Sequence, residues 1–188
     1  MISKKRNFKS IGLIPVRLNS SRLFQKALLN IDNLPMFIHT YKRALISKKL
    51  SAVYVCSDSE KIIKIAKRFN CKTIKTGKNL TGTDRISEAA QKIKTKYDLY
   101  VDIQGDEPLI DPRHIDKVIN WHKINFQFDI VVPSLKSKNI DTPHIVKIAK
   151  SNNQIIYFSR SLIPYPFKKI NKYYLKHLSV ISFKPEIQ

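Results

Sequence analysis

Apolar positions along this chain follow two different periods, and the two alternate. Short, β-branched apolar runs are typical of strands buried on both faces of a parallel sheet. Between these runs, apolar residues recur three and four positions apart, which is the spacing of an amphipathic helix. The predicted strands are 11–16, 52–56, 72–75, 99–103, 129–132, 146–150, 155–159 and 178–183. This alternation predicts βαβ units and therefore an α/β fold with a mostly parallel sheet.

Helix beginnings are marked by residues that suit a first turn or a cap. Proline is favoured in the first turn, where its missing N–H group is no loss, so helices are expected to begin near Pro35 and Pro112. Serine, threonine and aspartate accept hydrogen bonds from the first free N–H groups of a helix. We therefore expect Ser57 or Asp58 to cap one further helix and Thr83 to cap another.

Length and composition predict one globular domain over residues 1–188. A 43% hydrophobic content is enough for a full core at this length. Every apolar run is far shorter than the roughly 20 residues of a membrane span, and Pro15 and Arg17 interrupt the first run, as a signal peptide would not allow. Cys56 and Cys71 follow no metal-binding or redox spacing. A cytoplasmic protein with free thiols is expected.

The charge balance is strongly basic, with 35 Lys and Arg against 14 Asp and Glu and a net charge of +21. Such a balance can indicate a polyanionic partner such as RNA. The lysines are spread along the chain together with many Ile and Asn residues, however, and these residue types share A/T-rich codons. With no basic stripe and no RNA-binding motif, the sequence does not favour a nucleic-acid partner. The positive field still attracts small anions such as a nucleotide.

A loop rich in basic and hydroxyl side chains follows the first predicted strand. It contains Arg17, Arg22 and Lys26 with two serines between them. One interpretation is a solvated basic loop. The other is a polyphosphate site, because guanidinium forks and an ammonium group neutralise phosphate oxygens and the charge that builds in a transition state. The loop is not a Walker motif, since it lacks the glycines and the Lys-Ser/Thr pair.

A second candidate segment, Gly82-Thr83-Asp84-Arg85, stands where a helix begins. Free N–H groups at a helix N-terminus can receive an anion or a base edge. Alone, the segment is equally well explained as a capped helix start.

An acidic segment directly follows the strand 99–103. Asp102, Asp106 and Glu107 lie within six positions, in a chain with only 14 acidic residues. Carboxylates at the carboxyl end of a strand are suited to Mg²⁺, which prefers oxygen ligands and the phosphates of its substrate. The alternative is an acidic turn closed by Pro108. In a parallel sheet, this segment and the basic loop are expected at the same edge.

Two residues further along the chain offer polar chemistry. Arg160 ends an apolar strand and could hold a substrate carboxylate with two hydrogen bonds, or could be an ordinary surface cation. His177 precedes the last predicted strand and could contact a sugar, although a lone histidine is more often structural.

In their order along the chain, four segments resemble the CMP-Kdo synthetases, which are 3-deoxy-manno-octulosonate (Kdo) cytidylyltransferases. These segments read IPVRLNSSRLFQK at 14–26, GTDR at 82–85, QGDEPLI at 104–110 and YFSRSLIP at 157–164. The resemblance extends from about residue 11 to residue 183, and includes HIVK at 144–147 and KHL at 176–178.

The resemblance implies a Rossmann-like nucleotidyltransferase fold, a three-layer α/β/α structure, and transfer of CMP from CTP to Kdo with release of pyrophosphate for lipopolysaccharide biosynthesis. It also implies Mg²⁺ and a homodimer. The implied catalytic residues are Arg17, Lys26 and Asp106, with Asp106 also holding the metal. The implied nucleotide-binding residues are Pro15, Arg17, Arg22, Lys26, Gly82, Thr83, Asp84 and Arg85. The implied sugar-binding residues are Gln104, Arg160 and His177.

Departures from the family pattern keep other functions open. Phe24-Gln25 stands where the family has Pro-Gly, Ser179 replaces a glycine and Ile181 an aromatic residue. The segment between Pro164 and His177 is short, and the chain is expected to be C-terminally incomplete relative to the family, without a later helix and a further metal ligand. The alternatives are activation of another acidic sugar, such as 8-amino-Kdo or a nonulosonate, an inactive truncated relative that only binds nucleotide, and a basic nucleotide- or RNA-binding protein.

Overall fold

The computed structural model describes residues 8–19, 23–138, 140–165, 167 and 173–185. The chain forms two compact units, whereas the sequence predicts one domain. The first unit comprises Met1–Val131 and Ser179–Gln188, and the second comprises Val132–Leu178. Within the described ranges, no helix is both long and apolar enough to cross a bilayer.

The first unit is built on a six-stranded sheet in the order β5-β4-β1-β6-β12-β7. Neighbours among β5, β4, β1 and β6 are parallel, whereas β12 runs antiparallel to both β6 and β7. The strand bounds are β1 Ser10–Pro15, β4 Leu50–Ser57, β5 Thr73–Lys75, β6 Leu99–Ile103, β7 Ile130–Val131 and β12 Val180–Phe183. The predicted mostly parallel sheet is confirmed.

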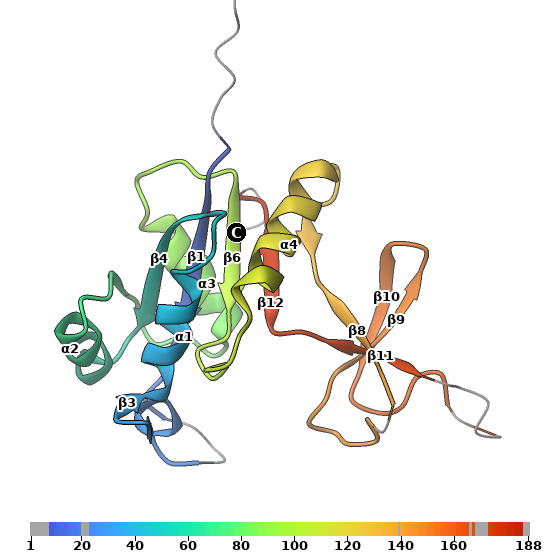
Figure 1. Ribbon diagram of the computed structural model, residues 1–188, viewed down its shortest axis with the longest axis horizontal. Coiled ribbons are helices and arrows are strands. Elements are labelled where there is room, and N and C mark those ends of the chain that lie inside the picture. The colour runs from blue at the N-terminus through green and yellow to red at the C-terminus, as the bar shows by residue number, and fades with distance from the viewer. Residues whose placement is uncertain (1–7, 20–22, 139, 166, 168–172, 186–188) are drawn as a thin grey trace, which may run out of the picture. The chain divides into compact units, whose positions relative to one another are not determined.

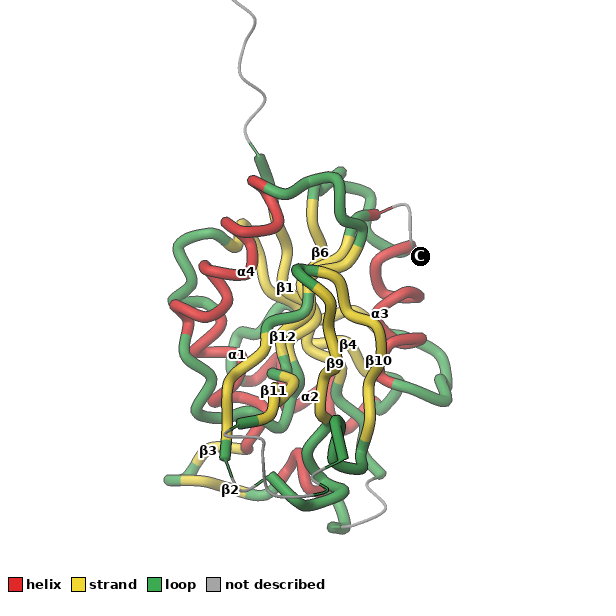
Figure 2. Tube along the Cα trace, turned by 90° about the vertical axis from the view of Figure 1, so that its right-hand side faces the viewer, coloured by secondary structure: helices red, strands yellow, loops and turns green. Residues whose placement is uncertain are grey.

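Helices cover both faces of this sheet. Their bounds are α1 Met36–Ala44, α2 Glu60–Arg68, α3 Gly82–Gln91 and α4 Pro112–Ile124. Figure 1 shows α1 and α4 in front of the strands, and Figure 2 shows these two helices on one side of β1 and β6 with α3 on the other. The predicted three-layer α/β/α architecture is confirmed. Helices also begin next to Pro35 and at Pro112, as predicted.

The two faces of the central strands are both apolar because successive side chains in a strand point to opposite sides. Ile14 of β1 belongs to a buried cluster with Phe37 of α1 and Ile115 of α4. Its neighbour Leu13 belongs to a second cluster with Ile86 of α3. Burying such a side chain contributes about 1.5–3 kcal/mol, so the core fixes the positions of the strand ends.

Helix α2 is capped by Ser59, whose hydroxyl accepts a hydrogen bond from the Ile62 N–H group at 3.4 Å. The prediction of Ser57 or Asp58 as this cap is wrong. Ser57 is the last residue of β4, and the Asp58 carboxylate pairs with Arg85 at 2.9 Å. A tertiary contact therefore decides among three neighbouring residues that all have capping chemistry.

A small hairpin follows the basic loop. A 3-10 helix, η1 (Lys26–Leu28), leads into β2 (Asn30–Ile31) and β3 (Leu34–Pro35), which pair antiparallel. Asp32 and Asn33 between these strands both have positive φ, 45° and 63°. Left-handed backbone at both positions is typical of a tight hairpin turn, and this hairpin was not among the predicted elements.

The second unit is a four-stranded antiparallel sheet in the order β10-β9-β11-β8. Its strands are β8 Ser134–Ser137, β9 Lys147–Ser151, β10 Gln154–Ser159 and β11 Tyr174–His177. The strand predicted at 178–183 is confirmed as β12 of the first unit, although it begins two residues later, at Val180. β11, which ends at His177, was not predicted. At the break between them, the Leu178 N–H group donates to the Pro133 carbonyl at 3.2 Å.

Candidate functional site

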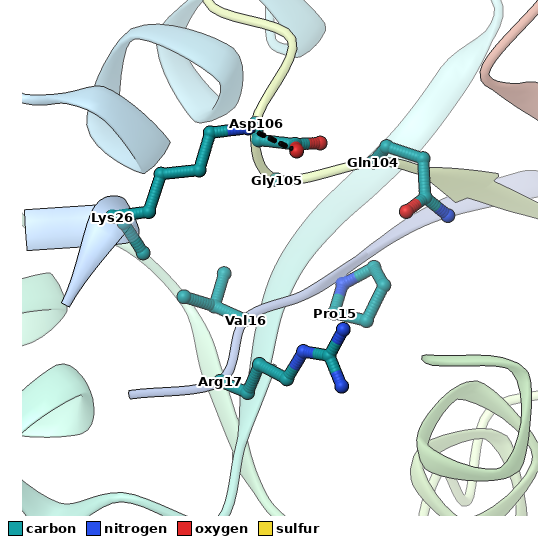
Figure 3. Close-up of a pocket in the computed structure, with 8 residues that line it drawn as sticks. Pro15, Val16, Arg17, Lys26, Gln104, Gly105 and Asp106 are labelled. Carbon is teal, nitrogen blue, oxygen red and sulfur yellow. Dashed lines mark hydrogen bonds and ion pairs between the residues drawn. The ribbon is translucent and has the colours of Figure 1, made fainter. Parts of the chain in front are cut away.

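A pocket opens at the carboxyl ends of the parallel neighbours β1 and β6, where ligands bind in open α/β sheets. Its volume is about 120 Å³. The lining residues, shown in Figure 3, are Pro15, Val16, Arg17, Lys26, Ala27, Gln104, Gly105 and Asp106. The structure thus brings together residues from the basic loop and the acidic segment, as the sequence predicts.

An ion pair joins the two sides of this pocket. Lys26 Nζ lies 2.6 Å from Asp106 Oδ2, and the two side chains are 35% and 46% exposed. The Arg17 guanidinium enters from the β1 side (Figure 3). Two cations and one carboxylate therefore reach the same open space, an arrangement suited to a polyanion with a bound cation.

The backbone before Lys26 adopts a conformation that favours glycine. Gln25 has φ 48° and ψ 35°, in the left-handed region, and its side-chain oxygen accepts from Lys61 Nζ at 2.9 Å. A left-handed residue other than glycine costs roughly 1–2 kcal/mol. Gln25 is the position where the resembled family has glycine, so the loop keeps this backbone shape without the glycine.

Gly105 allows the acidic segment to lie directly against β1. A Cβ atom at this position would come within 3.0 Å of both the Pro15 carbonyl oxygen and Val16 Cγ2. On the other side, the Thr40 hydroxyl donates to the Gly105 carbonyl at 3.2 Å. Gly105 is therefore packed on both sides, next to Asp106.

Because of this packing, Gly105→Ala is expected to lower the free energy of unfolding by about 1–3 kcal/mol. Relief of the clash should also move Asp106 away from its present place beside Lys26. Urea unfolding measures the loss of stability. Gly77→Ala is the matched control, since a Cβ there meets no atom closer than 3.5 Å. Equal stability of the two variants would contradict the proposed packing.

The three carboxylates of the acidic segment have different partners. Asp106 pairs with Lys26, Glu107 Oε1 accepts from the Ser179 hydroxyl at 2.9 Å, and Asp102 is buried beneath Gln104. In the part of the chain that is described, no group of three or more His, Cys, Asp or Glu side chains is arranged to hold a metal ion. A metal here would take Asp106 and complete its shell from substrate oxygens.

Asp102 is only 5% exposed. Both of its carboxylate oxygens lie near Gln104 Nε2, at 3.2 and 3.1 Å. Burial raises the pKa of Asp102 to about 7, and the hydrogen bond from Gln104 opposes this shift. The carboxyl group therefore titrates near neutral pH beside the pocket.

Helix α3 begins with a capping box. The Thr81 hydroxyl accepts from the Asp84 N–H group at 3.1 Å, and the Asp84 carboxylate accepts from the Thr81 N–H group at 3.0 Å. The prediction of Thr83 as the cap is wrong, because the reciprocal bonds require an acid three residues after the cap. Gly82 lies against Pro15, because a Cβ atom added at Gly82 would be 3.7 Å from Pro15 Cγ. Pro15 lines the pocket, so this helix start adjoins it.

Arg85 is turned inward and is 3% exposed. Its Nη1 atom lies 2.9 Å from Asp58 Oδ1 and donates to the Thr76 hydroxyl at 2.6 Å. These contacts tie α3 to the ends of β4 and β5. The structure thus places Arg85 behind the start of α3, where it holds Thr76 and Gly77 of the segment that leads into this helix.

Three predicted site residues remain. Arg22 falls outside the described residues. Arg160 and His177 belong to the second unit, where Arg160 Nη1 donates to the Pro143 carbonyl at 2.7 Å. The fully buried Lys147 ammonium donates to the Arg160 carbonyl at 2.6 Å. Burial lowers the pKa of His177, which favours its neutral form.

Three residues of the pocket region were not singled out from the sequence. Val16 and Ala27 line the pocket, and Thr40 holds the Gly105 carbonyl. The available signal for Thr40 was its place on the apolar face of α1, one turn after Phe37. A hydroxyl on a buried helix face needs a hydrogen-bond partner.

Comparison with known proteins extends this picture. A cytidylyltransferase family model matches residues 11–188. The mitochondrial 3-deoxy-manno-octulosonate cytidylyltransferase of Arabidopsis thaliana is 38% identical, over 96% of this chain and 65% of the relative. An 8-amino-3,8-dideoxy-manno-octulosonate cytidylyltransferase of Shewanella putrefaciens is 37% identical, over 92% and 74%.

A solved structure, CMP:2-keto-3-deoxy-manno-octonic acid synthetase complexed with CTP, superimposes with a TM-score of 0.88 at 32% identity, over 95% of this chain and 75% of that one. The chain thus spans between 65% and 75% of the length of these three proteins. The family model covers nearly all of the chain, and the superposition shows an α/β nucleotidyltransferase fold. The chain belongs to the cytidylyltransferase family.

Proposed function

We propose that this chain transfers CMP from CTP to Kdo and releases pyrophosphate, a step of lipopolysaccharide biosynthesis. The observation that carries the proposal is that the Lys26–Asp106 pair and Arg17 line one pocket at the carboxyl ends of β1 and β6. Phosphoryl transfer asks a protein mainly for alignment and for charge stabilisation. Both are available from charged side chains on the segments that follow two rigid strands, β1 and β6.

In this reaction, the anomeric hydroxyl oxygen of the sugar forms a bond to the α-phosphorus of CTP. The bond from the α-phosphorus to the bridging oxygen breaks, pyrophosphate leaves with the electron pair, and the hydroxyl proton passes to solvent. Lys26 and Arg17 neutralise the phosphate oxygens as this charge moves. The start of α3, from Gly82 to Arg85, supports the nucleotide. Pro15 lies between this helix start and the phosphates.

Asp106 is the residue proposed to hold Mg²⁺. Its carboxylate is nearly half exposed in the pocket, and Mg²⁺ commonly takes one or two carboxylates together with substrate phosphates. Bound there, the metal would neutralise charge on the triphosphate. Lys26 would then exchange its contact with Asp106 for a phosphate oxygen.

Gln104, Arg160 and His177 are proposed to contact the acidic sugar. Arg160 provides a guanidinium for its carboxylate, and a neutral His177 provides one donor and one acceptor for hydroxyl groups. A second candidate substrate is the 8-amino sugar, because the relative named for that sugar has almost the same identity to this chain. Turnover with Kdo and 8-amino-Kdo in competition separates the two.

Release of pyrophosphate by the purified chain with CTP, Mg²⁺ and Kdo tests the proposal. Reactions lacking each component in turn are the controls. Release that needs all three is expected. A folded protein that binds CTP without releasing pyrophosphate would instead support a nucleotide-binding relative without transferase activity. We also propose the cytoplasm as the site of the reaction, because CTP and reduced thiols such as Cys56 are found there.

We further propose that the chain forms a homodimer through β10. This strand is at the edge of its sheet and exposes Ile156, Tyr157 and Phe158, with Ile156 69% exposed. An apolar edge strand is a template for pairing with another strand, and a second copy provides the same surface about a two-fold axis.

Ile156→Lys is expected to raise the dimer dissociation constant at least ten-fold, as measured by sedimentation equilibrium. Ile130→Lys is the matched control, because Ile130 is half exposed on β7, at the edge of the other sheet. A monomeric wild-type chain, or equal weakening by both substitutions, would contradict the proposal.

A further inference from the structure

A buried carboxylate lies directly behind the pocket. Asp102 is the fourth residue of β6 and is paired with Leu13 of β1 on one side and Ile181 of β12 on the other. Because β1 and β12 flank β6 and the Asp102 side chain is only 5% exposed, its carboxylate has little access to water. The hydrogen bond that its carboxylate receives comes from Gln104, which is two positions further along the chain and directly follows β6.

The two ends of the Gln104 amide have opposite hydrogen-bonding character. The nitrogen donates and the oxygen accepts, whereas an ionised carboxylate only accepts. Ionised Asp102 therefore requires the nitrogen of Gln104, which lies 3.2 and 3.1 Å from its two oxygens. The amide oxygen is left on the side toward the pocket, as Figure 3 shows.

We propose that Asp102 is a positioning residue that fixes the amide of Gln104, so that the pocket presents the oxygen of Gln104 as an acceptor for a hydroxyl group of the acidic sugar. This inference rests on the proposed function, which places Gln104 against the sugar. Asp102 itself lies behind Gln104 and acts through it. The pairing selects for a hydrogen-bond donor on the substrate and against an acceptor at the same place.

Protonation of Asp102 removes this constraint. Burial raises its pKa to about 7, and the protonated group has an O–H donor that can bind the amide oxygen instead. Both orientations of Gln104 are then satisfied. Two further ionisable groups lie on this face of the sheet: Tyr100 of β6, whose pKa is raised by burial, and Cys56 of β4, whose thiol pKa is raised by burial first and also by the charge of Asp102. The Cys56 thiol therefore stays neutral. The charge of Arg85 on α3 lowers the pKa of the same thiol, but Arg85 is paired with Asp58.

Asp102→Asn tests the inference, because asparagine is isosteric and neutral at every pH. In the wild type, KM for Kdo is expected to rise about two-fold as pH falls from 8 to 6, because about half of the protein then presents the nitrogen of Gln104 to the sugar. In the variant it should equal the wild-type value at pH 6 across the whole range. KM for CTP should be the same in both proteins. Ser182→Ala, which removes a buried hydrogen bond to His122, is the control and should change neither KM.

The side-chain amide resonances of Gln104, assigned by their loss in Gln104→Leu, give a second measurement that does not depend on turnover. They are expected to titrate near pH 7 in the wild type and to be independent of pH in Asp102→Asn. An active wild type whose KM for Kdo is unchanged by Asp102→Asn at pH 8, or whose Gln104 signals do not titrate, would overturn the inference. Titrating signals without turnover would instead overturn the proposed function.

Discussion

Asp106→Asn is expected to lower the kcat of pyrophosphate release by about 10²- to 10³-fold, the range found when a charge-stabilising group is removed from an active site. The substitution keeps the shape of the side chain and removes its negative charge. The Mg²⁺ site then loses its carboxylate, and Lys26 loses the partner that lies 2.6 Å from it. Raising the Mg²⁺ concentration should restore little of the lost activity.

Asp129→Asn is the matched control for that experiment. Asp129 also forms a lysine pair, at 3.1 Å to Lys184, and its side chain is 67% exposed. Loss of a surface pair changes stability by about 0.2–1 kcal/mol and leaves a distant pocket intact. Activity in Asp106→Asn equal to that of the control would remove Asp106 from the mechanism.

The second large effect concerns stability and pH. Burial raises the pKa of Asp102 from 3.8 to about 7, so between these values the folded protein binds more protons than the unfolded chain. Stability therefore falls as pH rises through this window, and the full cost of the buried charge is present above pH 7. Asp102→Asn has no such cost. The variant is expected to be more stable than the wild type by about 2–4 kcal/mol at pH 8.

Urea unfolding at two pH values measures this difference. Near pH 4.5 the gain should shrink to less than about 1 kcal/mol, because Asp102 is then protonated in the folded protein. Asp129→Asn should show no comparable gain at pH 8. A stability gain in Asp102→Asn that is the same at both pH values would mean that the carboxyl group is not the source. Asp102 would then lower the stability of the fold while it improves recognition of the sugar, as is found for residues that are retained for function.

The layers of the fold could be predicted because their signal is local. The strand at 99–103 was predicted with the bounds that the structure gives, since all five of its side chains are buried. The caps at Ser59 and Thr81 were missed by one or two positions. Neighbouring hydroxyl and carboxylate residues have equal local preference, and the choice was made by the contact of Asp58 with Arg85 and by the reciprocal bonds of Asp84.

The second unit was less predictable, because its strands are defined by their partners. β8 and β11 pair only with distant segments, and neither has the apolar run that marks β1 or β6. The run at 178–183 looked continuous, but Ser179 separates the two units and its hydroxyl donates to Glu107. Such breaks depend on tertiary contacts that a local pattern does not contain.

In the candidate site, motif order identified the residues, and the structure added their relations. Arg17, Lys26, Gln104 and Asp106 were singled out from the sequence and line one pocket. Their binding roles stay predictions. The inward turn of Arg85 and the pairing of Asp102 with Gln104 could not be predicted, because both depend on which face of the sheet or helix is buried beside the pocket.

The most direct test of the central claim is to follow the phosphorus signals while the purified chain is incubated with CTP, Mg²⁺ and Kdo. The proposed reaction predicts that the three resonances of CTP are replaced by pyrophosphate and by one phosphodiester resonance of CMP-Kdo, in equal amounts and only when Kdo is present. CTP that remains unchanged beside a folded, CTP-binding protein, or that decays to CDP and phosphate, would contradict the claim.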